Sequence, residues 1–166
     1  MRKGILLLSA LLLLAFVNYG IGQREHLLEK GQVVLLELAP VDPRSLMQGD
    51  YMMLRFAIDD ALPQAEGEAS AAPPPRFAHV ALDAEGRASL VAVARALPAA
   101  PEQVGMRIRS RDGRYSIGPN AFFFQEGTAA AFEAARWGEF RVAPDGTALL
   151  THLRDEALNR LGAQRR

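Results

Sequence analysis

An uncharged apolar segment near the N-terminus places the strongest constraint on this chain. Residues 4–22 carry no charged side chain and are dominated by leucine and other apolar residues. As an α-helix these residues rise about 28 Å, which is close to the thickness of the hydrocarbon core of a bilayer. The segment therefore predicts a single helix that spans a membrane and contacts its lipid.

The charges around this segment predict its orientation. Two basic residues stand within residues 1–3, whereas the charges that follow Gly22 nearly cancel. The positive-inside bias then places the N-terminus in the cytoplasm and the rest of the chain outside. A cleaved signal peptide is the alternative, but residues 4–22 end without a small-x-small cleavage site and are longer than the usual apolar region. We expect a single-pass protein of the inner (cytoplasmic) membrane.

The exported part begins close to the membrane. Residues 23–31 continue the helical pattern as a juxtamembrane extension, and Gly31 is a natural C-cap. Residues 32–166 then form one periplasmic domain. Within it, residues 63–75 are rich in proline and alanine and predict a flexible loop.

Short apolar runs separated by turn residues predict a mainly β domain. Hairpin chemistry recurs around Gly86, at Asp112-Gly113 and at Asp145-Gly146. An alanine-rich stretch at 129–136, with Thr128 as its N-cap, predicts one short internal helix. The expected fold is antiparallel, barrel-like or a sandwich. For the polar C-terminal residues 154–166 we expect a short, frayed helix.

Alternation along residues 51–58 predicts which side chains enter the core. The expected core face is Met52, Leu54 and Phe56, and the opposite face is Tyr51, Met53 and Arg55. Further along, residues 122–124 are three consecutive phenylalanines, which would place rings on both faces of one strand. At least one of those rings should meet another element or a partner.

Composition excludes several classes of function. Basic and acidic residues are equal at 19 each, so no net field attracts nucleic acid. Cysteine is absent, and the three histidines are too widely spaced to suggest a metal site. No Gly-x-Ser-x-Gly motif is present, and the only lysines, Lys3 and Lys30, flank the apolar segment. We therefore predict no catalytic residues, no metal and no cofactor.

The densest cluster of special residues precedes the strand at 51–58. Its candidate binding residues are Asp42, Arg44, Ser45, Gly49, Asp50 and Tyr51. One interpretation is a rigid turn in which Arg44 pairs with Asp42 or Asp50. The other is a preorganised loop whose Arg44, Asp50 and Tyr51 meet a partner or an anionic group. Trp137 is a further candidate, which could pack in the core, cap a pocket or lie at the membrane interface.

Residues 49–56 (GDYMMLRF) resemble the signature of the GDYxxLxY family of membrane-anchored bacterial proteins, with Phe56 where the pattern ends in tyrosine. Residues 38–46, the N-terminal apolar segment and the single following domain are similar to that family as well. The resemblance implies no established reaction. It also implies that members are often encoded beside multi-pass membrane proteins.

A fainter similarity concerns fold. Residues 44–50, 121–125 and 136–140 resemble, in order, the conserved boxes of type I signal peptidases, which carry a curled β domain behind an N-terminal helix. Superposing the Gly-Asp pairs puts the peptidase nucleophile at Val41, and no lysine is available as its base. The resemblance implies a shared scaffold without the catalytic pair.

Two functions follow from these residues. The first is a non-enzymatic, membrane-anchored accessory domain that binds a multi-pass membrane protein through the loop at 40–51 and the adjoining aromatic strands. The alternative is an atypical envelope hydrolase that uses Asp42, Ser45 and Asp50 in an unfamiliar arrangement.

Overall fold

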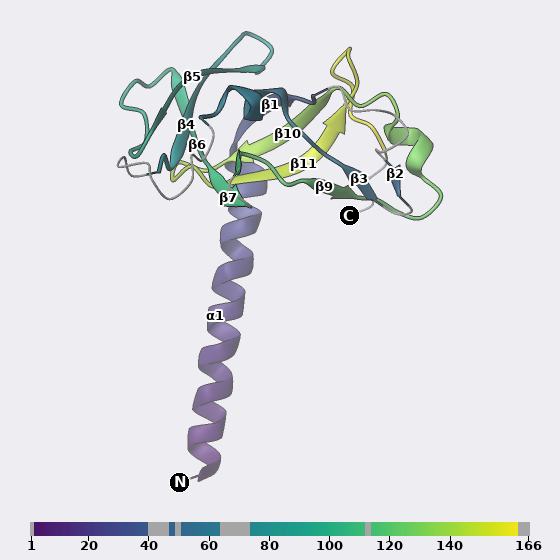
Figure 1. Ribbon diagram of the computed structural model, residues 1–166. Helices are drawn as coiled ribbons and strands as arrows, with labels where there is room; N and C mark the ends of the chain where they lie inside the picture. The colour runs from purple at the N-terminus through teal and green to yellow at the C-terminus, as the bar shows by residue number, and fades with distance from the viewer. Residues whose placement is uncertain (1, 40–46, 49–50, 64–73, 112–113, 163–166) are drawn as a thin grey trace.

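A long helix and a domain of short β-strands make up the molecule (Figure 1). The computed structural model describes residues 2–39, 47–48, 51–63, 74–111 and 114–162, without the side chains of 2–8, 47–48 and 111. Within these residues the elements are α1 (Arg2–Lys30) and eleven strands in four sheets. The N-terminus lies at the far end of α1, well away from the domain.

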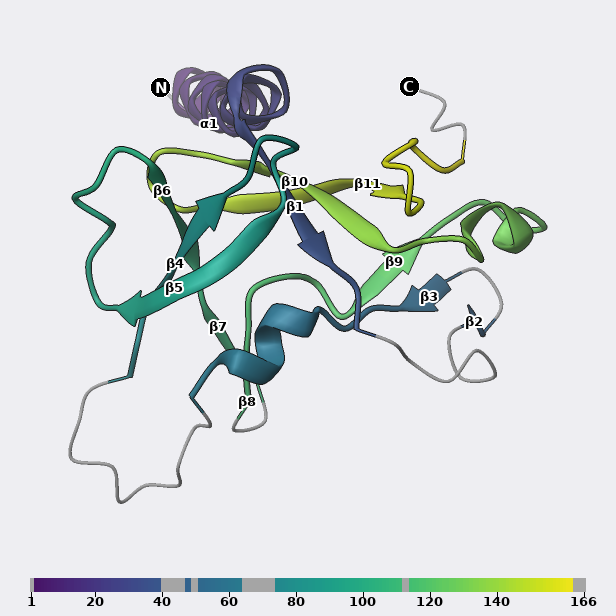
Figure 2. The same cartoon turned by 90° about the horizontal axis from the view of Figure 1, so that it is seen from above.

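The helix ends where the sequence predicts. Its last turn closes with the Gly31 amide donating to the Leu27 carbonyl at 2.9 Å. A side chain at Gly31 would collide with Leu27, which explains the glycine. Arg141 donates through Nη1 to the Gly31 carbonyl at 3.1 Å, so a cation covers the negative end of the helix. Seen from above in Figure 2, α1 stands beside β10 and β11.

The described residues include no helix with both the length and the apolar character needed to cross a bilayer. The membrane-spanning helix predicted over residues 4–22 is therefore not confirmed. Residues 4–8 of that segment lie where side chains are not described.

The sheet β1-β10-β11 follows α1 directly. β1 (Gln32–Glu37) pairs antiparallel along its whole length with β10 (Trp137–Val142), which pairs with β11 (Ala148–Arg154). The predicted hairpin between β10 and β11 is confirmed, with Gly146 at a φ of +84°. Such a positive φ favours glycine because it has no Cβ to clash.

The sheet β5-β4-β6 contains the second predicted hairpin. It is built from β4 (Phe77–Leu82), β5 (Ala88–Ala94) and β6 (Gln103–Arg107). Asp83 accepts hydrogen bonds through Oδ1 from the amides of Glu85 and Arg87 and so closes the turn between β4 and β5. This sheet approaches the first one where the Leu35 amide donates to the Gly86 carbonyl at 2.8 Å.

The two remaining sheets are small. One is β2-β3-β9, made of β2 (Met47–Gln48), β3 (Tyr51–Met53) and β9 (Ala121–Phe123). The other pairs β7 (Arg109–Arg111) with β8 (Arg114–Ser116). The predicted hairpin around Asp112-Gly113 is confirmed by the pairing of Arg111 with Arg114, although residues 112–113 lie outside the described part.

The mainly antiparallel β prediction is confirmed, but a barrel-like closure is not. The described strands fall into four separate sheets that do not join into one closed surface. The strand predicted over 51–58 is shorter than expected, because β3 ends at Met53 and a 3-10 turn, η1 (Ala57–Ala61), takes its place. The flexible loop predicted at 63–75 lies largely outside the described residues, which omit 64–73.

The predicted internal helix is wrong in length and type. Only a 3-10 turn, η2 (Ala129–Phe132), forms within residues 129–136. Thr128 does not cap it by a side-chain hydrogen bond, since its hydroxyl donates to the Gln125 carbonyl at 2.6 Å. Eight alanine-rich residues are too few to offset the cost of helix nucleation without a packed face.

The C-terminal helix expected over 154–166 is also wrong. Leu158 adopts a φ of +65°, which ends any helical run, and the Leu161 amide donates to the Leu153 carbonyl at 2.8 Å. The described part of this segment therefore folds back along β11. Residues 163–166 lie outside the described part.

The core lies between the sheets and is centred on two aromatic rings. Phe56 and Phe140 meet edge to face, with ring centroids 5.3 Å apart. Gly118 and Gly138 flank Phe56, and a Cβ at Gly138 would lie 2.8 Å from its Cε1. These glycines leave the space that the Phe56 ring occupies.

Candidate functional site

The outer face of β3 and β9 carries exposed apolar side chains. Tyr51 lies opposite Phe123 and Met53 opposite Ala121, so their side chains project from the same face. The Tyr51 and Phe123 rings are 5.8 Å apart and inclined at 41°. Phe123 is 75% exposed and Met53 is 50% exposed. We call these three large side chains, Tyr51, Met53 and Phe123, the outer aromatic face.

Buried neighbours hold this face in place. Met52 and Phe122 point inward and are buried, so each strand alternates between core and solvent. Phe122 meets Phe132 edge to face at 5.4 Å, and Phe124 stacks on the same ring at 5.3 Å. The predicted alternation is therefore confirmed, with two of the three phenylalanines packed on η2 and Phe123 left outside.

Arg55 continues the signature beyond the outer aromatic face. It lines a polar pocket of about 310 Å³ together with Asp59 and Asp60, and it forms an ion pair with Asp60. Burial raises the pKa of Asp59, although its carboxylate accepts a hydrogen bond from the Ile117 amide at 3.0 Å. The charges within this pocket largely neutralise one another, which makes it a poor site for a charged ligand.

Trp137 lies in a different sheet from Tyr51. It starts β10, is half-buried, and lies under the guanidinium of Arg87, whose central carbon is 5.3 Å from the ring centroid. One side of the indole is thus covered by a cation. The structure does not bring the two described candidates, Tyr51 and Trp137, into one site.

The other predicted site residues lie outside the described residues. They are Asp42, Arg44, Ser45, Gly49 and Asp50. Whether they form a rigid turn or a binding loop stays a prediction from the sequence. The hydrolase alternative, which depends on three of them, stays a prediction as well.

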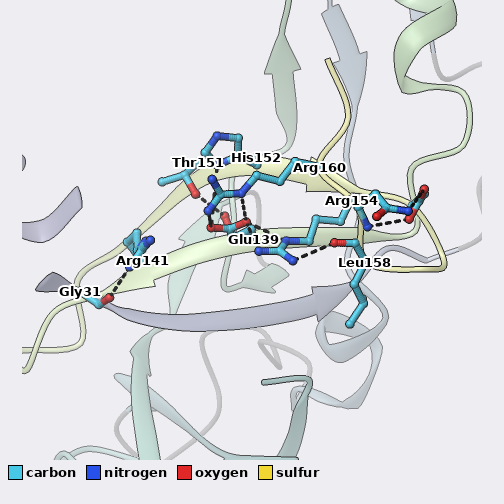
Figure 3. Close-up of polar contacts among 10 residues, drawn as sticks. Gly31, Glu139, Arg141, Thr151, His152, Arg154, Leu158 and Arg160 are labelled. Carbon is cyan, nitrogen blue, oxygen red and sulfur yellow. Dashed lines mark hydrogen bonds and ion pairs between the residues drawn. The ribbon is translucent and has the colours of Figure 1, made fainter. Parts of the chain in front are cut away.

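A buried carboxylate lies under β11. Glu139 on β10 is 0% exposed and accepts hydrogen bonds from two arginines, as Figure 3 shows. Arg160 binds it in a bidentate manner, from Nε to Oε2 at 2.9 Å and from Nη2 to Oε1 at 2.7 Å. Arg154 donates from Nε to Oε2 at 2.7 Å and from Nη1 to the Leu158 carbonyl at 2.8 Å. The C-terminal segment is thereby fastened to the sheet.

This cluster is structural, because its carboxylate is fully engaged. Burial alone would raise the pKa of Glu139, but the hydrogen bonds from Arg160 and Arg154 outweigh it and hold the pKa below its ordinary value. An ionised carboxylate that solvent cannot reach has no route to a substrate proton. We therefore assign Glu139 to stability and not to chemistry.

Stability is expected to fall as the pH drops below about 6.5, the ordinary pKa of histidine. Burial, and then Arg160, lower the pKa of His152 against an opposing effect of Glu139, and Arg154 and Arg141 lower it further. As the pH falls, His152 therefore binds a proton in the unfolded chain before it does so in the folded protein. The stabilisation that neutral His152 provides is full above about pH 6.5 and is lost as the pH falls through the folded-state pKa of His152.

Fluorescence of the single tryptophan during urea unfolding at about pH 7.5 and about pH 5.5 measures this loss. The acid-induced loss should shrink in His152→Gln. It should be unchanged in His26→Gln, because His26 lies exposed on α1. An equal loss in both variants would contradict the assignment to His152.

The three histidines differ in their exposure to solvent. His26 is exposed, but His79 is half-buried and its Nε2 lies 2.8 Å from the Ala96 carbonyl oxygen. His152 is partly buried, with Nδ1 3.9 Å from Glu139 Oε1 and without a hydrogen bond among the described residues. Among the residues that the structure describes, no three histidine, aspartate or glutamate side chains are placed to hold a metal ion.

The sequence did not identify Glu139 as an important side chain, and it indicated only that one of the rings at 122–124 meets another element or a partner. Phe123 becomes a neighbour of Tyr51 only through the register of β3 with β9, which local sequence does not give. Glu139 did carry a signal, since it is a charged residue between glycine and phenylalanine in a run that also contains tryptophan and valine. A charge in such a strand needs partners from neighbouring elements.

Comparisons with known proteins bear on the signature directly. No curated protein and no solved structure matches the chain. The family model described as GDYXXLXY protein matches residues 13–153, which is most of the chain. Around the signature the structure gives the pattern a physical basis, with Leu54 and Phe56 buried and Tyr51 on the outer face. This chain belongs to the GDYXXLXY family.

Proposed function

We propose that this protein is a non-enzymatic accessory domain that is attached to the inner membrane through α1. The domain binds a multi-pass membrane protein with its outer aromatic face. The observation that carries the proposal is the exposure of Phe123 beside Tyr51 of the family signature. We assign the N-terminus to the cytoplasm and the domain to the periplasm, as the charge bias around residues 4–22 indicates.

The outer aromatic face suits recognition of a protein. Aromatic side chains and methionine are enriched in protein interfaces, where they bury a large area with little loss of side-chain freedom. Phe123 and Met53 are both at least half exposed, although water disfavours such apolar area. Because Met52 and Phe122 are locked in the core, the face is held rigid, and binding needs little ordering.

The pattern of exposure along α1 supports attachment to a membrane. Leu11, Leu12, Leu13 and Leu14 are between 61% and 66% exposed. Successive residues of a helix point about 100° apart, so these four leucines cover all of its sides. No single packing face against the domain could bury them, whereas lipid or neighbouring membrane helices could.

Attachment is tested by fractionating cells that express the full chain. We expect the protein to stay in the membrane pellet after alkaline carbonate extraction. Leu12→Arg/Leu13→Arg should release a large fraction, because each arginine at the centre of a membrane helix costs about 2.5–3.5 kcal/mol. As a control, Leu12→Ile/Leu13→Ile should remain in the pellet. Recovery of the unaltered protein in the soluble fraction would refute the attachment.

Binding is tested by replacing one exposed ring. Phe123→Ser should reduce co-purification of a multi-pass partner from detergent-solubilised membranes at least tenfold, the loss expected for an interface hot spot. Its free energy of unfolding should change by no more than about 0.5 kcal/mol, because the side chain is exposed. Val91→Ser removes an apolar side chain that is 51% exposed on β5 and should leave co-purification unchanged. Equal recovery from both variants would exclude the outer aromatic face as the binding site.

A further inference from the structure

A groove lies between α1 and the turn that joins β10 to β11. Its volume is about 1060 Å³, and its lining is contributed by one side of α1 from Phe16 to Gly31 and by residues of the turn. Phe16, Gly20, Gln23 and Leu27 follow each other at intervals of three or four residues, so they lie along one side of the helix. The domain and the helix thus enclose a single continuous site.

The lining changes character along the helix. At the end farther from the domain it is apolar, with Phe16 and Val17, and at Gly20 a side chain would meet nothing within 4 Å. At the end nearer the domain it is polar and basic, with Arg24, His26 and Lys30. An amphipathic ligand with an apolar tail and an anionic head would match this order.

The charges at the polar end favour an anion. Among the residues that the structure describes, Asp145 is the one acidic residue in the lining. Its carboxylate is already engaged by Arg107 at 3.0 Å and by the Thr147 hydroxyl at 2.9 Å. Arg24 and Lys30 therefore present positive charge to the groove, and the one described carboxylate in the lining is already bound to Arg107 and Thr147.

We propose that this groove binds one anionic glycerophospholipid, with an acyl chain along Phe16 and Val17 and the phosphate between Arg24 and Lys30. The inference rests on the proposed attachment, since α1 in a bilayer would bring the groove to the level of the headgroups. Lipid bound there would brace α1 against the β10–β11 turn and set the tilt of the domain over the membrane.

Photo-labelling of the full-length protein tests the site. The protein is reconstituted into phosphatidylcholine vesicles that contain a little photoactivatable phosphatidylglycerol, and after illumination the labelled peptides are mapped. We expect label on residues 16–31 and on the turn at 143–147. Arg24→Ala and Lys30→Ala should each lower labelling about fivefold, as expected for one cationic residue near an anionic membrane. Arg95→Ala removes an exposed arginine far from the groove in sequence and should have no effect.

A second variant fills the groove without removing charge. Gly20→Leu has room for its Cβ and should reduce labelling while the protein still sediments with vesicles. Ala10→Leu adds similar apolar bulk to α1 outside the lining and should label normally. The lipid site would be refuted if Arg24→Ala, Lys30→Ala and Gly20→Leu all leave the labelling unchanged. It would also be refuted if a photoactivatable phosphatidylcholine labels the protein to the same extent. If a partner helix fills the groove instead, purified protein would label weakly in every variant, which overturns it too.

Membrane attachment and lipid binding in the groove are refuted by different results. Protein that does not sediment with vesicles would refute the attachment itself. If the protein sediments with vesicles but its labelling is the same in all variants, only lipid binding in the groove is refuted.

Discussion

Replacement of Glu139 by alanine is expected to lower the free energy of unfolding by about 3 kcal/mol, the lower end of the cost of removing one partner from a buried ion pair, because the side chains of Arg154 and Arg160 are 22% and 48% exposed. Glu139 is the only acidic group that contacts Arg154 and Arg160 among the described residues. Without it, two guanidinium groups are left next to each other at the edge of the core. The segment after β11 would also lose its bidentate contact and is expected to detach.

Urea unfolding followed by Trp137 fluorescence measures the effect, because Trp137 starts the strand that carries Glu139. Asp60→Ala is the matched control, since it breaks an ion pair whose two side chains are both more than half exposed. Such exposed pairs contribute about 0–1 kcal/mol. A loss in Glu139→Ala no greater than that in Asp60→Ala would show that the cluster does not hold the C-terminal segment.

Replacement of Phe56 by alanine is also expected to lower the free energy of unfolding, by about 3–5 kcal/mol. Phe56 is 1% exposed and meets Phe140 edge to face. The flanking Gly118 and Gly138 have no side chains that could move into the space left behind. The cavity would therefore stay largely open, which puts this substitution at the costly end of its class.

The same fluorescence assay measures this loss, and Phe123→Ala is its control. Both substitutions remove one phenyl ring, but only Phe56 is in the core, so Phe123→Ala should cost less than about 0.5 kcal/mol. Similar losses of stability in the two variants would contradict the placement of Phe56 in the core. Phe56→Leu, which fills part of the space, is expected to fall between them.

Features encoded by local sequence were predictable. The alternation from Tyr51 to Phe56 persists beyond the end of β3, because an extended chain keeps its period of two without complete pairing. The turns at Gly86 and Gly146 were predictable because each needs a positive φ that glycine adopts without strain. The helix end at Gly31 was predictable from the glycine as well, although the reason differs: a Cβ there would collide with Leu27.

Features that depend on distant pairing were not predictable. Glu139 meets Arg154 and Arg160 only because β10 pairs with β11 and the chain then turns back, whereas no local pattern in the sequence links the three charges. Phe123 joins Tyr51 across a register that no local pattern specifies. The helix predicted at 129–136 failed for a related reason, since helix propensity is a weak predictor even for alanine, and the segment forms only the 3-10 turn η2.

Site-specific crosslinking in native membranes tests the central claim most directly. A photo-reactive amino acid is placed at position 123, on the outer aromatic face, and for comparison at position 91, on β5. We expect position 123 to form a discrete adduct with a multi-pass membrane protein, and position 91 to form none. Absence of an adduct at 123, or the same adduct from both positions, would contradict it.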